Sequence, residues 1–324
     1  MRTLPAPIYK LLLLIVLYPW FLKLFYLGNI GEVNKWLSSI AIILAFSTPI
    51  YSLYVSIKLG STHANNVEKS QRIFALMGSI VPSLFTLIGV ILYMLGMGMT
   101  TELVVYYVFW ALAALVLLKP TACNLSAVKL DQNKLRFAHG ISSLLLLLFI
   151  AAHLFNHLSA NWGGETHIQI MEILRVFYRS SFIEPILFAA LIFQVTTGLM
   201  LISKHVGGEI DGYRTTQLST GLLLVVFLAS HVTAVLALGR GFLGIDTNWD
   251  WLVAAPGLLE DPWNVRLVVH YALGVFALLV HVLLGVRVVI SAHQGTALAN
   301  KVFWGLVSIP FVMMFFVMRP LLLA

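Results

Sequence analysis

Long apolar stretches with almost no charge recur along the whole sequence, and they restrict the fold more than any other feature. Hydrophobic residues make up 60% of the 324 residues and charged residues 10%, whereas soluble domains carry about 25% charged residues. A water-soluble fold of this size would need more charge on its surface, so the chain belongs in lipid. Because hydrocarbon offers the backbone no hydrogen-bond partners, each crossing segment has to be an α-helix of about 20 residues.

Nine windows bounded by charged residues, Gly or Pro are apolar enough to cross a bilayer. They are 8–28, 36–58, 72–96, 102–119, 136–158, 182–204, 213–238, 266–290 and 301–322. The first window lacks a small-residue cleavage site and extends to Leu27, so it predicts a span and not a signal peptide. The sequence therefore predicts an all-α polytopic membrane protein with about nine transmembrane helices.

The positions of Lys and Arg predict the orientation, since these residues favour cytoplasmic loops. With the N-terminus inside, 13 of the 20 basic residues fall in inner segments, and the outer loop 239–265 is acidic. We expect a bacterial cytoplasmic (inner) membrane protein with its N-terminus in the cytoplasm and its C-terminus outside. The basic residues are scattered and form no patch of five, so the net charge of +7 indicates topology and no nucleic-acid binding.

Histidines divide the chain unevenly, because nine of the ten follow the polar segment 121–135. We predict an N-terminal four-helix membrane region (1–120), a cytoplasmic linker (121–135) and a five-helix bundle (136–324). The exception, His63, lies in a polar loop and is expected to be solvated.

The single cysteine, Cys123, excludes an intrachain disulfide, a thiolate iron–sulfur site and a structural Cys-type zinc site.

Two helices of the predicted bundle share one pattern, in residues 139–153 and 217–231. Each has a polar residue fourteen positions before a histidine, hydroxyl residues one turn in, and Ala or Ser just before the histidine. At about 1.5 Å per residue, His153 and His231 each lie roughly 9 Å outward of their helix centres, at one depth. Facing imidazoles at one depth predict a bis-His haem b site. The alternative is two buried histidines hydrogen-bonded to Ser, Thr or carbonyl groups.

His281 lies near mid-membrane in the eighth predicted span, and the residue at matching depth on the sixth is Gln194. Gln is a poor iron ligand, so these two residues form a degenerate second haem position. The alternative for His281 is a packed residue hydrogen-bonded to Gln194. His139 lies about 9 Å further inward by helical rise, too far for an axial pair with His281.

Four further residues near the predicted outer interface are candidates for cofactor contacts. His157 and His270 lie at similar depth and are placed to bond a quinone carbonyl or haem propionates. Arg175 and Arg179 carry charge that would neutralise propionates, with membrane-edge anchoring as the alternative.

The stretch from about 134 to 320 resembles the five-helix, dihaem cytochrome b anchor subunit of succinate:menaquinone oxidoreductases and quinol:fumarate reductases. The matching residues are Arg136, His139, His153, Asn156, His157, Leu174, Arg175, Tyr178, Arg179, Glu184, Gln217, Thr220, Gly221, His231, His281, Gly285 and Arg287. The resemblance implies that His153 and His231 hold an outer haem and that His281 is an inner-haem ligand. With Gln194 at the fourth ligand position, it implies one haem instead of two.

These features predict a membrane-bound electron-transfer subunit that exchanges electrons between a quinone or quinol and a partner redox protein. The chain carries no flavin or nucleotide motif, so the resemblance implies separate flavoprotein and iron–sulfur subunits at the cytoplasmic face. One alternative is a haem-free transporter whose path is lined by His139, His157 and His270, although the predicted spans nearly lack carboxylates. A second alternative is a structural or assembly subunit.

Overall fold

The computed structural model describes residues 6–61, 66–118, 132–206 and 208–324. His63, Cys123 and most of the predicted 121–135 linker lie outside these residues. The described chain is helical and contains no strand. Within these ranges, nine helical segments are long and apolar enough to cross a membrane, so the protein is an integral membrane protein in contact with lipid.

The nine segments coincide with the nine predicted windows, which confirms the fold class. They are Ala6–Asn29 (α1), Lys35–Gly60 (α2), Val67–Met94, Met99–Leu117 (α5), Asn133–Trp162, Ile183–His205 (α8), Gly212–Leu243, Arg266–Gln294 (α12) and Thr296–Leu323. The third segment comprises α3 (Asn66–Met77), the 3₁₀ turn η1 (Gly78–Ile80) and α4 (Val81–Met94). The fifth comprises α6 (Gln132–Ser159) and the 3₁₀ turn η2 (Ala160–Trp162).

Two of the spans are interrupted for reasons that the sequence explains only in part. The last consists of α13 (Thr296–Leu306) and α14 (Ile309–Leu323), and Pro310 lies in the first turn of α14. Its ring nitrogen has no N–H for the carbonyl of Leu306, four residues earlier, so the helical hydrogen bonds are interrupted there. The seventh begins as α9 (Gly212–Val232) and continues as the π-helix η3 (Thr233–Leu243). Such π segments are frequent at functional sites, and this one begins two residues after His231.

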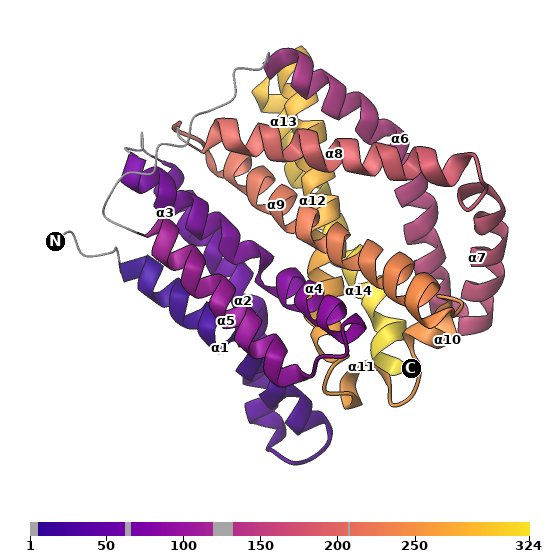
Figure 1. The fold of residues 1–324 in the computed structure, drawn as a ribbon. Helices are drawn as coiled ribbons and strands as arrows, with labels where there is room; N and C mark the ends of the chain where they lie inside the picture. Colours follow the sequence, from indigo (N-terminus) through magenta and orange to yellow (C-terminus); the bar gives the residue numbers. More distant parts are fainter. Residues whose placement is uncertain (1–5, 62–65, 119–131, 207) are drawn as a thin grey trace.

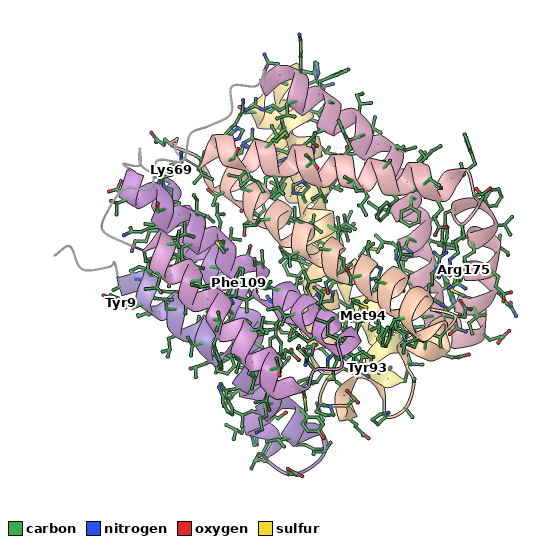
Figure 2. The ribbon with its side chains drawn as sticks, in the orientation of Figure 1. Tyr9, Lys69, Tyr93, Met94, Phe109 and Arg175 are labelled. Carbon is green, nitrogen blue, oxygen red and sulfur yellow. The ribbon has the colours of Figure 1, made fainter. Side chains whose placement is uncertain are left out.

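Three helices lie in the connections and not among the spans. The segment between α6 and α8 forms α7 (Gly164–Tyr178), while α10 (Trp249–Leu252) and α11 (Gly257–Glu260) lie in the loop before α12. In Figure 1, α7 stands at the edge of the molecule beside the end of α6, on the side away from α1–α5. Figure 2 marks its position through Arg175, which lies far from Tyr9 at the start of α1.

The N-terminal helices share a hydrophobic core with α9 and α12. This core contains Tyr18, Phe85 and Tyr106 together with Leu223 of α9 and Val269 of α12. Phe85 packs edge-to-face against Tyr18 and Tyr106, with ring centroids 6.0 and 5.3 Å away, the geometry that aromatic pairs prefer. In Figure 1, α9 and α12 accordingly lie between α1–α5 and the α6–α8 segment.

Polar contacts reinforce the packing of the N-terminal helices on the rest of the chain. Ser79 donates a hydrogen bond to the carbonyl of Ser219 (3.3 Å), and the amide of Ile210 donates to the carbonyl of Gly60 (3.0 Å). Arg266 of α12 forms an ion pair with Glu102 of α5, and both side chains are 3% exposed. Glu102 is therefore a carboxylate inside a span. From the sequence, the spans were expected to contain almost no carboxylates.

The α6–α8 side of the bundle is covered by less protein than the centre. The most apolar window of Val67–Met94 is 83% buried, whereas the corresponding windows of Asn133–Trp162 and Ile183–His205 are 11% and 6% buried. Helix α6 packs mainly against α8 and α7, while α9 packs mainly against α12 and α4. Two groups of helices therefore face each other, with α6 in one and α9 in the other.

Candidate functional site

The structure brings His153, near the end of α6, beside His231, near the end of α9. Their ring centroids are 6.0 Å apart and the ring planes meet at 66°. The depth argument predicted this proximity, since both helices run in the same direction and carry the histidine at the same height.

A phenylalanine one helical turn earlier stacks on each of these imidazoles. Phe149 lies 5.5 Å from His153 at an interplanar angle of 17°, and Phe227 lies 5.7 Å from His231 at 5°. Residues four apart are neighbours on one helix face, so each Phe limits the rotation of the ring that follows it. This repeated Phe-x-x-x-His spacing is visible in the sequence and adds to the pattern shared by residues 139–153 and 217–231.

Two more histidines extend the pair into a four-histidine cluster, made of His153, His157, His167 and His231. The Nε2 atoms of His157 and His153 are 3.3 Å apart, and the ring of His167 lies 5.4 Å from that of His157. The sequence did not single out His167, because it lies on α7, outside the spans, and reaches the cluster only because α7 folds back along α6.

Helix α7 is held in place through both faces of His167. Asn156 Nδ2 lies 3.1 Å from His167 Nε2, and the ring of Trp249 is 5.2 Å from the imidazole.

Within the described ranges, no group of three or more His, Cys, Asp or Glu residues has the geometry to hold a metal ion. In this arrangement the four rings of the cluster do not form a three-ligand metal site.

His167 also predicts a pH dependence of stability. Its burial, followed by the nearby charge of Arg175, lowers its pKa from 6.5 to about 4. A depressed histidine pKa means that the unfolded chain binds more protons between these values, so stability is complete above about pH 6.5 and falls toward pH 4. We expect the thermal unfolding midpoint of the detergent-purified protein to drop between about pH 7 and pH 5, and to drop less in His167→Gln. Parallel pH curves for the two proteins would contradict this.

His270 packs against Phe227, next to the cluster. It is 1% exposed, its ring is 4.7 Å from that of Phe227, and its Nδ1 lies 3.2 Å from the hydroxyl of Ser83 on α4. Its ring contacts are with Phe227 and Tyr271, and not with His157.

Arg175 and Arg179, the candidates for propionate contacts, are both engaged by the segment before α10. Arg175 Nη1 forms an ion pair with Asp246 at 2.7 Å and Nη2 donates to the carbonyl of Thr247. Arg179 Nη2 donates to the hydroxyl of Thr247 at 3.1 Å. In this structure the two arginines fasten α7 to the loop that follows η3.

At the opposite end of the bundle, Gln194 and His281 have different partners. Gln194 Nε2 lies 3.0 Å from His139 Nε2, and Gln194 also accepts a hydrogen bond from Ser142. His281 Nδ1 instead lies 3.1 Å from the carbonyl of Gln217 and 3.2 Å from the hydroxyl of Thr220. The alternative of a hydrogen bond between His281 and Gln194 is therefore wrong. Gln194 meets His139 on α6 instead, although helical rise put the two residues about 9 Å apart in depth.

No protein-family model, curated protein or solved structure matches this chain. What it does has to be inferred from its own residues, foremost from the four-histidine cluster in the membrane bundle.

Proposed function

We propose that this protein is a b-type cytochrome of the membrane, with His153 and His231 as the axial ligands of one haem. The observation that carries the proposal is the distance of 6.0 Å between the two ring centroids. Bonds from imidazole nitrogen to zinc are about 2.0–2.1 Å long, so two imidazoles on opposite sides of one metal ion have centroids roughly 6 Å apart. The two rings come from different helices, as an axial pair requires.

The surroundings of His231 also fit a bound group. The side chain of His231 makes no hydrogen bond to the described part of the chain, and its Nδ1 is buried without a partner. Such an orphaned group costs about 1–3 kcal/mol, a cost that coordination through Nδ1 itself would remove. His153, His157 and His231 are each partly exposed, so the surrounding helices do not fully enclose the three rings.

Each residue of the cluster has a distinct part in this proposal. Phe149 and Phe227 hold the two imidazoles in orientation, and the small neighbours Ala152 and Ser230 let a wide macrocycle approach both helices. His157 lies against His153 and is placed to exchange a proton at its Nε2. The haem, when bound, supplies reversible one-electron chemistry, whose potential is tuned by the axial ligands and burial.

The proposed reaction is electron transfer between a quinone or quinol at the outer side and a partner protein at the cytoplasmic face. This is the role that the resemblance to succinate and fumarate reductase anchors implies. His157 and His270 are the candidates for quinone contact. Because the chain has one cysteine and no flavin motif, flavoprotein and iron–sulfur partners would supply the dehydrogenase chemistry. The proposed setting is the bacterial inner membrane, with the N-terminus inside.

A spectrum of the purified protein tests the proposal. We expect the dithionite-reduced minus oxidised difference spectrum to show b-type bands, and a pyridine haemochrome assay to give about one haem per chain. The protein is expressed with added haem precursor, so that a low haem content cannot result from a shortage of haem in the cells. A monodisperse protein that stays colourless under these conditions would refute the cytochrome and favour a haem-free membrane scaffold or transporter.

A further inference from the structure

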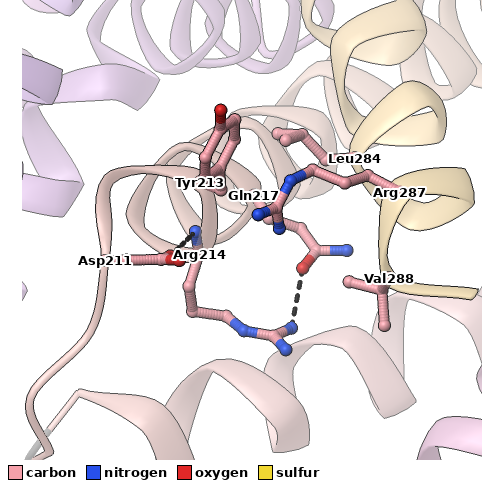
Figure 3. Close-up of a pocket in the computed structure, with 7 residues that line it drawn as sticks. All are labelled: Asp211, Tyr213, Arg214, Gln217, Leu284, Arg287 and Val288. Carbon is pink, nitrogen blue, oxygen red and sulfur yellow. Dashed lines mark hydrogen bonds between the residues drawn. The ribbon is translucent and has the colours of Figure 1, made fainter. Parts of the chain in front are cut away.

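A second polar site lies at the end of the bundle where α9 begins. It is a small pocket of about 70 Å³, which we call the arginine pocket. It is lined by Asp211, Tyr213, Arg214, Gln217, Leu284, Arg287 and Val288. Figure 3 shows the side chains of Arg214 and Arg287 reaching into it from α9 and α12, with Gln217 between them.

Both guanidinium groups are fixed in place and still have donors to spare. Arg214 Nη1 donates to Gln217 Oε1 at 2.7 Å. Arg287 Nε donates to Asn300 Oδ1 at 2.9 Å, and its guanidinium lies 3.6 Å above the ring of Tyr213. A guanidinium has five N–H donors, so within the described chain each arginine uses one and leaves the others for a ligand.

Positive charge in the arginine pocket exceeds the negative charge that lines it. Asp211 is the single carboxylate among the lining residues, and its Oδ1 accepts the backbone N–H of Arg214 as the cap of α9. Arg136 of α6 adds a third positive charge that repels Arg214, as Arg287 also does. Like charges gathered at the edge of an apolar bundle are unfavourable unless an anion joins them.

The shape of the pocket indicates which kind of anion. Its volume is suited to one compact group and not to a protein surface. The buried Leu284 closes it on one side, and Val288 of α12 adds an apolar side chain to its lining. Planar guanidinium groups bind phosphate oxygens through paired N–H donors. Basic residues at the cytoplasmic edge of a span also attract anionic lipids.

We propose that the arginine pocket binds a phosphate group through Arg214 and Arg287, with the headgroup of an anionic phospholipid as its source in the membrane. Its acyl chains would extend past Val288 toward the exposed Val289 of α12. This site is separate from the four-histidine cluster, and the proposal does not depend on haem.

Thermal unfolding of the delipidated full-length protein in detergent tests the site. We expect phosphatidylglycerol to raise the midpoint by at least about 2 °C, as a ligand specific for the folded state does. Phosphatidylcholine, whose phosphate is balanced by its own cation, is expected to raise it less. Inorganic phosphate is the third addition, and a rise with phosphate alone would support the site with the free anion as its source.

Variants show whether the shift in the unfolding midpoint comes from the arginine pocket or from positive charge elsewhere on the protein. The double variant Arg214→Gln/Arg287→Gln is expected to lose the shift, while Lys301→Gln, which removes an exposed cation of α13 outside the pocket, retains it. An equal shift in the double variant and the wild type, or no shift with either phosphate source, would overturn the proposal. If the double variant fails to fold, native mass spectrometry of the wild type decides, because a protein that retains no added phosphatidylglycerol lacks the site.

Discussion

His153→Ala and His231→Ala are each expected to abolish the b-type absorption bands of the purified protein. Each substitution removes one of the two imidazoles whose rings are 6.0 Å apart. A haem held by one axial bond loses much of its affinity and the low-spin spectrum that two imidazoles confer. We expect a loss of at least about tenfold in haem content by pyridine haemochrome, the usual scale for disrupted ligation.

Two control variants make this result specific. His293→Ala removes an exposed histidine near the end of α12 and should leave haem content and spectrum unchanged. His157→Ala removes the ring whose Nε2 is 3.3 Å from that of His153 and should keep the haem. Full haem content in His153→Ala combined with loss in His157→Ala would show that the ligand lies one turn further along α6. Size-exclusion profiles identify any variant that simply misfolds.

The second large effect is expected at Glu102, because Glu102→Ala leaves the charge of Arg266 buried without a partner. Both side chains are 3% exposed, and Arg266 also stacks against Phe85 and Trp263 at 4.5 and 4.6 Å. Removing one partner of a buried ion pair costs about 3–5 kcal/mol. We expect a pronounced fall in the unfolding midpoint, measured by denaturant titration in detergent.

The chain provides a matched comparison for this substitution. Arg240 and Glu184 also form an ion pair, at 2.5 Å, but their side chains are 35% and 36% exposed. Exposed pairs contribute about 0–1 kcal/mol, so Glu184→Ala should change stability little. The double variant Glu102→Ala/Arg266→Met should recover part of the loss, since it removes the unpaired charge as well. Similar effects of Glu102→Ala and Glu184→Ala would contradict the buried ion pair.

The sequence predicted the spans because hydrophobic length is a local property of the chain. All nine windows recur in the structure within a few residues, since the hydrocarbon thickness alone determines how long each must be. The same argument predicted the height of His153 and His231 correctly, because rise per residue is a constant of the α-helix. Height was therefore readable for this pair but not for Gln194 and His139, which helical rise placed about 9 Å apart and whose side-chain nitrogens lie 3.0 Å apart.

The rotation of each helix about its axis was not readable, because packing against other helices sets it. Gln194 matches His281 in predicted depth, yet its side chain meets His139 and Ser142 on α6. His167 was overlooked for a similar reason, as its contact with Asn156 depends on the course of α7. The buried partner of Glu102 lies 164 residues away in sequence, a separation at which no local pattern signals contact.

The helices that carry His153 and His231 are anchored very unequally. Helix α9 shares the aromatic core of the N-terminal helices, whereas most of α6 and α8 faces away from protein. Helix α9, which carries His231, is thus surrounded by protein, whereas α6, which carries His153, has few protein neighbours. If the site binds haem as proposed, the core around Phe85 positions the α9 side of it, so that N-terminal helices without histidines would determine how the site is assembled.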